Sequence, residues 1–588
     1  MTFRRAWGEV LAEIPRSRRF HWVDLLLVVG IAGLFLGTLD LAKQVTGELH
    51  ETIAIDLNDP WVLIRFTFFS LCRGLVAYAL SLAFTLAYGY WAAKDPVGER
   101  VLVPLLDILQ SIPVLSFLPG LVLALVAIFP TRNIGLELAT ILMIFTGQVW
   151  NMTFSFYHSL KAVPQDQREV ATLYRLNWWQ RLRWVELPFS AIGLVWNSMM
   201  SMAGGWFFLT LCESFQLKGK DYRLPGIGSY VSVAVDEGNY GAMAAAFAAM
   251  VVMIVLLDQL LWRPVVVWAQ KFRIEEGGGG GGPAMTSWFL TWVRRSRLVA
   301  YVTGRFRRKP AELPAAAVAP KLADTPLPTK PLAPSRLSVA TSYALFGLMI
   351  LLLLWGGVKL VKLILPITLA QWGETVLAAV YTLLRVLTAT AIGTLWTVPA
   401  GLAIGLSPRL SRQLQPVMQV LASFPAPMLF PAVIAVLTFA GIRLDFGSIV
   451  LMLLGTQWYL LFNVTAGAMA IPADLREAAR SFSVGGWLRF WKVHVPAIFP
   501  YLVTGWVTAA GGAWNASIVS EYVTFKKEPQ IAHGIGAQIA QAANASEEQG
   551  YGLLAASTLV MALVVVTFNR TVWRYCYRLA ETKFSLNK

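Results

Sequence analysis

Long apolar stretches recur along the whole chain of 588 residues and constrain its fold more than any other feature. A transmembrane helix needs about 20 mainly apolar residues. The stretches therefore predict twelve spanning helices in two series of six. The first series is expected near 22–43, 61–93, 101–129, 134–160, 185–212 and 241–270, and the second near 339–361, 370–406, 413–440, 446–470, 495–520 and 551–575.

The composition supports an all-α integral membrane protein. Hydrophobic residues make up 56% of the chain and charged residues only 14%, whereas soluble domains carry about 25% charged residues. This excludes a soluble enzyme of this length, and a disordered chain would need low hydrophobicity. The net charge of +16 is attributed to cytoplasmic loops, not to a nucleic-acid partner. The scattered cysteines and histidines predict no disulfide framework and no metal site.

Basic residues predict the orientation. Five arginines precede residue 20, whereas residues 44–64 contain no Lys or Arg. Because cytoplasmic loops are enriched in Lys and Arg, the N-terminus is expected in the cytoplasm, and an even number of spans places the C-terminus there too. The first apolar stretch lacks a small-residue cleavage site and is interpreted as an anchor.

A Gly/Pro-rich linker is expected at 271–338, between halves at 1–270 and 339–588. It contains a glycine run at 277–282 and a Pro/Ala-rich stretch at 310–334, a composition that forms tethers and buries no core. Around Trp288, aromatic residues accompany six arginines between positions 294 and 308. Two hypotheses stay open for this segment: an interfacial helix on an anionic leaflet, or a merely basic linker.

The two halves are copies of each other. Arg73 matches Arg385, 312 positions later (385 − 73), and Gly147 matches Gly455 at an offset of 308 (455 − 147). Further matched pairs include Pro113 and Pro425, Glu169 and Glu477, Glu213 and Glu521, Gly226 and Gly534, and Trp262 and Trp573. Constant offsets with two small indels indicate a tandem duplication. Because each copy has six spans, the repeats run parallel about an axis along the membrane normal.

Each copy has one long hydrophilic loop between its fourth and fifth spans, at 163–188 and 471–496. Each loop contains a proline suited to a helix start, followed by an Arg-Glu pair and small residues. Small residues let another surface approach closely, and Arg and Glu can make charge-assisted contacts to it. The sequence thus predicts a short docking helix in each loop.

This pattern resembles the EAA loop of permease subunits of bacterial ABC importers, which reads Glu-Ala-Ala, three residues, Gly, then a hydrophobic residue, any residue and Leu-Pro. The wider sequence resembles the nitrate/taurine/sulfonate/bicarbonate branch over about 60–270 and 370–580. Two features depart from the family pattern. The motif glycine is Arg175 in one copy and Ser483 in the other, and Val170 replaces the first alanine in the first copy.

The resemblance implies a fused double permease of a bacterial inner membrane, acting in ATP-driven import. Coupling helices near 163–176 and 471–484 would each dock on one of two copies of a separate ATPase, which would hold ATP and Mg²⁺. This chain lacks the Gly-x-x-x-x-Gly-Lys-Ser/Thr motif and is not expected to be an enzyme. An extracytoplasmic solute-binding protein would deliver a small anion. The ATPase-coupling candidates are Arg168, Glu169, Ala171, Arg175, Arg476, Glu477, Ala478, Ala479 and Ser483.

Several polar residues and prolines are candidates for the pathway or its gate. Glu213 and Glu521 are interpreted either as gate or anchoring residues, since intramembrane carboxylates are costly, or as interfacial carboxylates. Arg73 and Arg385 could attract an anion, although a structural link to a neighbouring helix is favoured. Pro113 and Pro425 are expected to break the third spans, either to line a cavity or as packing kinks. The remaining candidates are Gln110, Gln148 and Asn151.

A secondary transporter with two six-helix repeats is the alternative. It would need ion-coupling carboxylates inside the spans, where Asp107 and Asp258 are the main candidates. It would also leave the two matched loops unexplained. A membrane enzyme is disfavoured because the sequence shows no catalytic constellation.

Overall fold

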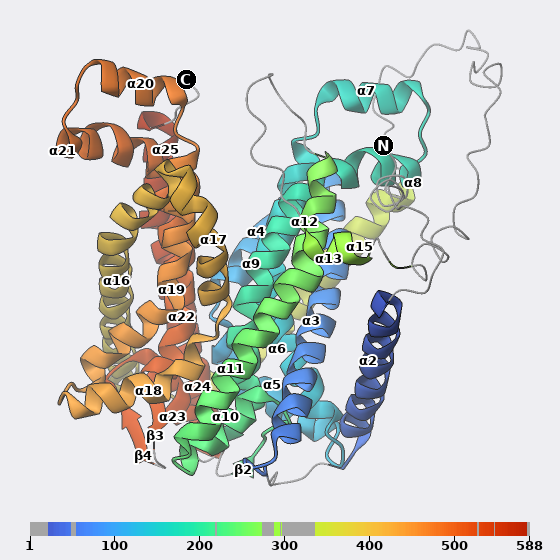
Figure 1. Cartoon of the computed structure of the whole chain (residues 1–588). Helices are drawn as coiled ribbons and strands as arrows, with labels where there is room; N and C mark the ends of the chain where they lie inside the picture. Colours follow the sequence, from blue (N-terminus) through green and yellow to red (C-terminus); the bar gives the residue numbers. More distant parts are fainter. Residues whose placement is uncertain are drawn as a thin grey trace.

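The computed structural model describes residues 22–48, 55–217, 220–272, 287–293, 296, 336–525, 528–545 and 547–584. These residues form two bundles of long helices that stand side by side (Figure 1). The only strands described make two short antiparallel hairpins. The all-α membrane fold predicted from the apolar stretches is confirmed.

The first bundle contains the elements up to residue 272. Its helices and strands are α2 (Trp22–Thr46), α3 (Pro60–Lys94), α4 (Pro96–Ser111), η1 (Val114–Phe117), α5 (Leu118–Ile128), α6 (Ile134–Lys161), α7 (Gln165–Leu173), α8 (Trp178–Arg181), η2 (Leu182–Glu186), α9 (Leu187–Glu213), β1 (Gln216–Leu217), β2 (Lys220–Asp221), α10 (Ile227–Asp236), α11 (Tyr240–Leu257), η3 (Asp258–Trp262), α12 (Arg263–Ala269) and η4 (Gln270–Phe272).

The second bundle repeats this order. Its elements are α15 (Arg336–Ile364), α16 (Leu369–Leu406), α17 (Pro408–Ser423), α18 (Ala426–Phe439), α19 (Leu444–Met469), α20 (Ala473–Ser481), α21 (Gly486–Arg489), η6 (Phe490–His494), α22 (Val495–Ser520), β3 (Tyr522–Phe525), β4 (Glu528–Ile531), α23 (Ile535–Asn544), α24 (Glu547–Phe568), η7 (Asn569–Trp573) and α25 (Arg574–Lys583).

The number of apolar spans falls short of the predicted twelve. In the described part of the chain, nine helices are long and apolar enough to cross a membrane, and two bent pairs raise the number to eleven. The stretch at 185–212 forms α9, a helix of 27 residues that is not among the eleven. It carries polar residues such as Ser198 and Ser201, which are buried between helices. A helix enclosed by other helices does not need the apolar surface that lipid requires.

Both third spans are broken next to the expected prolines. The helix pairs α4–α5 and α17–α18 each bend by 83°, at Pro113 and Pro425. A proline disfavours helical conformation in the residue before it, which explains the position of the break. In the first copy, the freed backbone N–H of Val114 donates to Oδ1 of Asn515 in the second bundle, at 2.7 Å.

The first span of each copy breaks the pseudo-symmetry. α2 packs against α3 and α6 of its own bundle and is tied to α3 by two hydrogen bonds from Arg65 to Asp40. α15 instead packs against α24 and also against α4 of the other bundle. The largest hydrophobic cluster contains residues of both bundles. The two copies therefore form one joined body with a long seam.

A short part of the linker lies against the first bundle. Its helix α13 (Trp288–Val293) buries Leu290, and the indole N–H of Trp288 donates to Oε1 of Gln259 at 2.8 Å. Ser296 donates to the buried Asp24. The glycine run and the Pro/Ala-rich stretch lie outside the described residues, as do the arginines expected beside this helix.

Candidate functional site

The short helices α7 and α20 lie at the same end of the two bundles, beyond the ends of the long helices (Figure 1). Each follows a proline, and each buries one alanine: Ala171 and Ala479 are 2% and 5% exposed. These two alanines therefore seat the helices on their own chain and do not face a partner. Ala478 is exposed.

In the Arg-Glu pair of each loop, the arginine is partly buried against its own chain and the glutamate is exposed. Arg168 donates from Nη2 to the backbone carbonyl of Lys161 at 2.8 Å, at the C-terminal end of α6. Arg476 is half-buried. Glu169 and Glu477 are both exposed, and Glu169 accepts a hydrogen bond from Gln165 in the preceding turn. The arginine thus positions the first loop, while the carboxylates are free to meet another surface.

Both helices end at a residue in the left-handed conformation, where the family motif has glycine. Arg175 has φ 47° and Ser483 has φ 49°. In each copy, two backbone hydrogen bonds close this turn over the last carbonyls of the helix: Arg175 N–H to Thr172 and Leu176 N–H to Ala171, and the matching pair from Ser483 and Val484. This geometry normally selects glycine because a Cβ is disfavoured there. The backbone keeps the motif even though its glycine is absent.

Substituting Ser483→Gly is expected to stabilise α20 by about 0.5–1 kcal/mol, because glycine has no Cβ penalty at positive φ. Amide hydrogen exchange of the peptide that contains α20 should slow by about threefold in this variant. Gly441, at φ 68° with open space around it, provides the reverse control. Gly441→Ser should weaken the end of α18. Faster exchange in Ser483→Gly would contradict the argument.

Large side chains project from the ends of both loop helices. Tyr174 and Phe482 occupy matching positions and are 72% and 82% exposed. Trp178 and Trp487, at the starts of α8 and α21, are 60% and 76% exposed. Exposed aromatic residues beside a carboxylate are typical of protein–protein contact sites. We call Glu169, Tyr174 and Trp178, with Glu477, Phe482 and Trp487, the loop surface.

The first loop is held to its bundle more strongly than the second. The buried Glu186 accepts from Lys94 at 2.5 Å and pairs with Arg181 at 3.2 Å, and Lys161 pairs with Glu99 at 2.7 Å. In the second copy, Glu186 is replaced by His494, and Lys161 and Glu99 are replaced by Met469 and Ser411. The hydroxyl of Ser411 lies 4.0 Å from the Met469 sulfur. The second copy therefore lacks these ion pairs.

A buried ion cluster fixes the opposite end of the first bundle. Arg73 donates to both oxygens of Glu137 at 2.6 Å and to Glu213 at 2.7 Å. All three side chains are at most 2% exposed. Glu213 also accepts from the Ser70 hydroxyl and from the backbone N–H of Gly228, so the cluster joins α3, α6, α9 and α10. Every charge has a partner, as burial requires.

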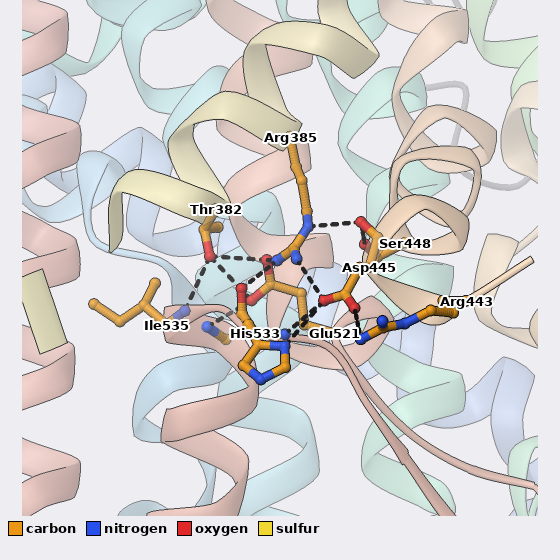
Figure 2. Close-up of polar contacts among 9 residues, drawn as sticks. Thr382, Arg385, Arg443, Asp445, Ser448, Glu521, His533 and Ile535 are labelled. Atoms are coloured by element: carbon orange, nitrogen blue, oxygen red, sulfur yellow. Dashed lines mark hydrogen bonds and ion pairs between the residues drawn. The ribbon is translucent and has the colours of Figure 1, made fainter. Parts of the chain in front are cut away.

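The second bundle has a corresponding cluster around Arg385 (Figure 2). Arg385 donates to Glu521 at 2.8 Å and to Asp445 at 3.2 Å, and Glu521 accepts from Thr382 and from the backbone N–H of Gly536. Glu521 is fully buried, but the Asp445 side chain is 21% exposed and also contacts Arg443. This cluster therefore opens to the surface on one side.

These clusters explain the repeated Gly-Ile-Gly segments. A Cβ on Gly226 would lie 2.2 Å from the Glu213 carboxyl carbon, and one on Gly534 would lie 2.2 Å from Glu521 Oε2. Only glycine lets the backbone approach the carboxylate this closely.

Gly226→Ala and Gly534→Ala are each expected to destabilise the protein by about 1–3 kcal/mol, because the new methyl group collides with a buried carboxylate. Thermal melting of the detergent-solubilised protein, followed by size-exclusion chromatography, measures this loss. Gly120→Ala is the matched control, since nothing lies within 4 Å of its added Cβ. Equal melting of all three variants would show that the carboxylates move aside.

The remaining pathway candidates do not form one site. Gln110 lies at the seam and donates to Asp107 at 3.2 Å. Gln148 is buried, with Nε2 near the sulfur of Met202 at 3.5 Å, and Asn151 is exposed. The structure thus brings Arg73 together with Glu213, and Arg385 with Glu521, but leaves the other candidates apart.

Sequence reasoning missed the third members of the clusters, Glu137 and Asp445. Both are acidic and lie 308 positions apart (445 − 137), the offset that Gly147 and Gly455 share. An acid repeated near the start of the fourth span was the available signal. The roles of Ser70 and Thr382 were also missed, although both lie in matched segments.

Comparison with known families decides the classification. The family model described as binding-protein-dependent transport system inner membrane component matches twice, at residues 85–261 and 397–572. The chain belongs to this family. The two matches, displaced by 312 positions at their starts (397 − 85), also confirm that the chain contains two tandem copies.

Individual relatives agree with this assignment. The chain is 29% identical over 121 residues to a nitrate import permease protein from Synechocystis sp., covering 21% of this chain and 42% of the relative. It is 30% identical over 141 residues to a bicarbonate transport system permease protein from Synechococcus elongatus, covering 24% and 49%. A glycine betaine transport system permease protein from Bacillus subtilis is 25% identical over 186 residues, covering 32% and 61%. The chain spans about half the length of the curated relatives it matches.

Proposed function

We propose that this chain is the membrane-spanning permease of an ATP-driven importer, with two permease units fused in one polypeptide. Two copies of a separate ATPase would dock on the loop surface, one on α7 and one on α20. ATP binding in the ATPase pair would move both loop helices, and the two bundles would then rock about the seam. Such coupling needs two global states that the ATPase contacts unequally.

The observation that carries this proposal is the paired construction of the loop helices. Both have a buried alanine, an exposed glutamate, a left-handed end and an exposed aromatic residue, at matching positions. An exposed aromatic side chain is unfavourable in water, so its presence at the same position of both loops indicates a contact surface. Two equivalent docking surfaces fit two equivalent partners.

The distribution of basic residues supports a cytoplasmic location for the loop helices. Cytoplasmic ends of membrane proteins are enriched in Lys and Arg. The basic residues at the ends of the long helices near α7 and α20 include Lys94, Arg100, Lys161, Arg181, Arg183, Arg409, Arg412, Arg489, Lys492, Arg578 and Lys583. The proposed orientation places both β-hairpins on the extracytoplasmic side, where a solute-binding protein would approach.

We assign a small anion as the cargo. The names of two matched relatives specify nitrate and bicarbonate, both small oxyanions. The buried arginines Arg73 and Arg385 are already paired within their clusters, so they support the fold and do not bind the cargo. The structure supports a helix-anchoring role for Glu213 and Glu521 over a mobile gate.

Purification of the tagged chain from its native membrane, with mass spectrometry of the associated proteins, tests this function. The expected result is an ATP-binding subunit at about two copies per chain. Reconstitution into vesicles should then give uptake of nitrate or bicarbonate that requires ATP. Uptake driven by an ion gradient without any ATPase would overturn the proposal and favour a secondary transporter.

A further inference from the structure

A cavity of about 440 Å³ lies at the seam, where α4 of the first bundle meets α22, α24 and α25 of the second. This volume is large enough for a small ligand or a lipid headgroup. The polar residues in its walls are Asp107, Gln110, Asn569, Arg570 and Arg574.

The duplication supplies an internal comparison for this cavity. At the corresponding seam, α17 meets α9, α11 and η3, and the cavity there measures only about 10 Å³, which is room for about one water molecule. The walls correspond by position: Gln419 matches Asp107, Asp258 matches Asn569, and Trp262 matches Trp573.

The two cavities differ in charge as well as in size. At the small cavity, Asp258 pairs with Arg263 at 3.4 Å, and Gln259 is engaged by Trp288 of the linker. In the second copy, Asn569 replaces Asp258, and Arg570 replaces Gln259. The charge balance at this position therefore changes from neutral to positive.

One of the two arginines of the large cavity has no counter-charge among the residues that the structure describes. Arg570 pairs with Asp107 across the seam at 3.4 Å. Arg574 forms no hydrogen bond or ion pair with any residue that the structure describes. The matching residue in the first copy, Arg263, forms an ion pair with Asp258. The guanidinium of Arg574 can therefore bind an incoming anion through two parallel hydrogen bonds.

The rest of the cavity wall is apolar or aromatic. The apolar part of the wall consists of Ile108, Val507 and Val566. The aromatic part consists of Trp573 and Tyr577, and Trp and Tyr are the residue types enriched at the boundary between membrane and water. α25, which begins at Arg574, lies toward the same end as α7 and α20 (Figure 1). The arginines beside an apolar wall therefore fit a ligand with an anionic headgroup and an apolar tail.

We infer that this cavity binds an oxyanion through Arg574 and Arg570, and that the first copy lacks this capacity because Asp258 lies beside Arg263. A phosphate-type headgroup of an anionic phospholipid and a free inorganic oxyanion share the required chemistry. Basic pockets between membrane helices bind anionic headgroups in this way. The inference does not depend on the proposed transport function.

The experiment transfers the neutralising carboxylate between copies. The full chain is purified as wild type, as Asn569→Asp, as Arg574→Gln, and as Arg263→Gln for the control at the small cavity. Native mass spectrometry after incubation in mixed phosphatidylglycerol and phosphatidylcholine vesicles measures retained phosphatidylglycerol. Melting of the delipidated protein in inorganic phosphate or nitrate measures binding of a free anion. Asn569→Asp changes only the amide to a carboxylate, so it remains informative even if Arg574→Gln fails to fold.

Wild type and Arg263→Gln should retain phosphatidylglycerol, and Asn569→Asp should retain about fivefold less, the effect of cancelling one cation near a lipid headgroup. This result would identify a lipid headgroup as the ligand. Stabilisation by phosphate or nitrate that Asn569→Asp abolishes, without selective lipid retention, would identify a free anion. Equal retention and equal melting in wild type and Asn569→Asp would overturn the inference.

Discussion

Arg73→Met is expected to destabilise the protein by about 3–5 kcal/mol, the largest effect of any single substitution considered for the fold. The substitution leaves Glu137 and Glu213 buried together without a cation, at 2% and 0% exposure. Removing one partner from a buried ion pair exposes the full desolvation cost of what remains. The measurement is the loss of monodisperse protein on heating in detergent, followed by size-exclusion chromatography.

The second copy provides the matched control. Arg385→Met removes the same guanidinium, but Asp445 remains 21% exposed and keeps its contact with Arg443 at 3.0 Å. Water and Arg443 can then compensate part of the lost charge, so the melting temperature should fall by clearly less than in Arg73→Met. Equal losses in the two variants would show that the openness of the second cluster has no energetic consequence.

Replacing both Tyr174 and Phe482 with aspartate is expected to abolish ATPase association while leaving the fold intact. Both side chains are largely exposed, so the substitutions remove no buried packing. An aromatic anchor at the centre of a protein interface contributes about 2 kcal/mol or more, and each replacement should weaken binding by about 30-fold or more. Quantitative pull-down of the ATPase with the tagged chain measures the loss.

Tyr240→Asp is the control for these aspartate variants. Tyr240 is 66% exposed at the start of α11. This start follows α10, which lies at the end of the bundle opposite to α7 (Figure 1). The same chemical change there should leave ATPase association unchanged. Retention of the ATPase by Tyr174→Asp/Phe482→Asp would place the coupling contact elsewhere in the chain.

Patterns of local sequence predicted most of the secondary structure. Eleven of the twelve predicted spans appear among the apolar helices and bent pairs, because lipid contact imposes a composition that is visible in any window of about 20 residues. α9 is the exception. It is surrounded by other helices and carries buried polar residues, and the sequence alone does not show that a span is surrounded in this way.

Pairwise partners across the fold could not be predicted in the same way. Arg73 is expected from the sequence to link to a neighbouring helix, but the repeated acid at Glu137 does not show that this residue, 64 positions away, receives two of its hydrogen bonds. Such pairing depends on which faces of α3 and α6 meet. The buried position of Ala171 also required the structure, because an alanine next to an Arg-Glu pair fits an outward or an inward face equally well.

Local sequence was enough to identify a duplicated membrane protein with one short helix in each long hydrophilic loop. Apolar stretches and constant offsets can be recognised without knowing which residues are in contact. Three features became visible only in the folded chain: the left-handed turns at Arg175 and Ser483, the packing of α15 against α4, and the difference between the open and the closed seam. Each of these depends on contacts between residues far apart in the chain, or on a backbone angle that the surrounding turn enforces. The two copies share a fold, and they differ both within each bundle, as at Glu137 and Asp445, and at the seam where side chains of both copies meet.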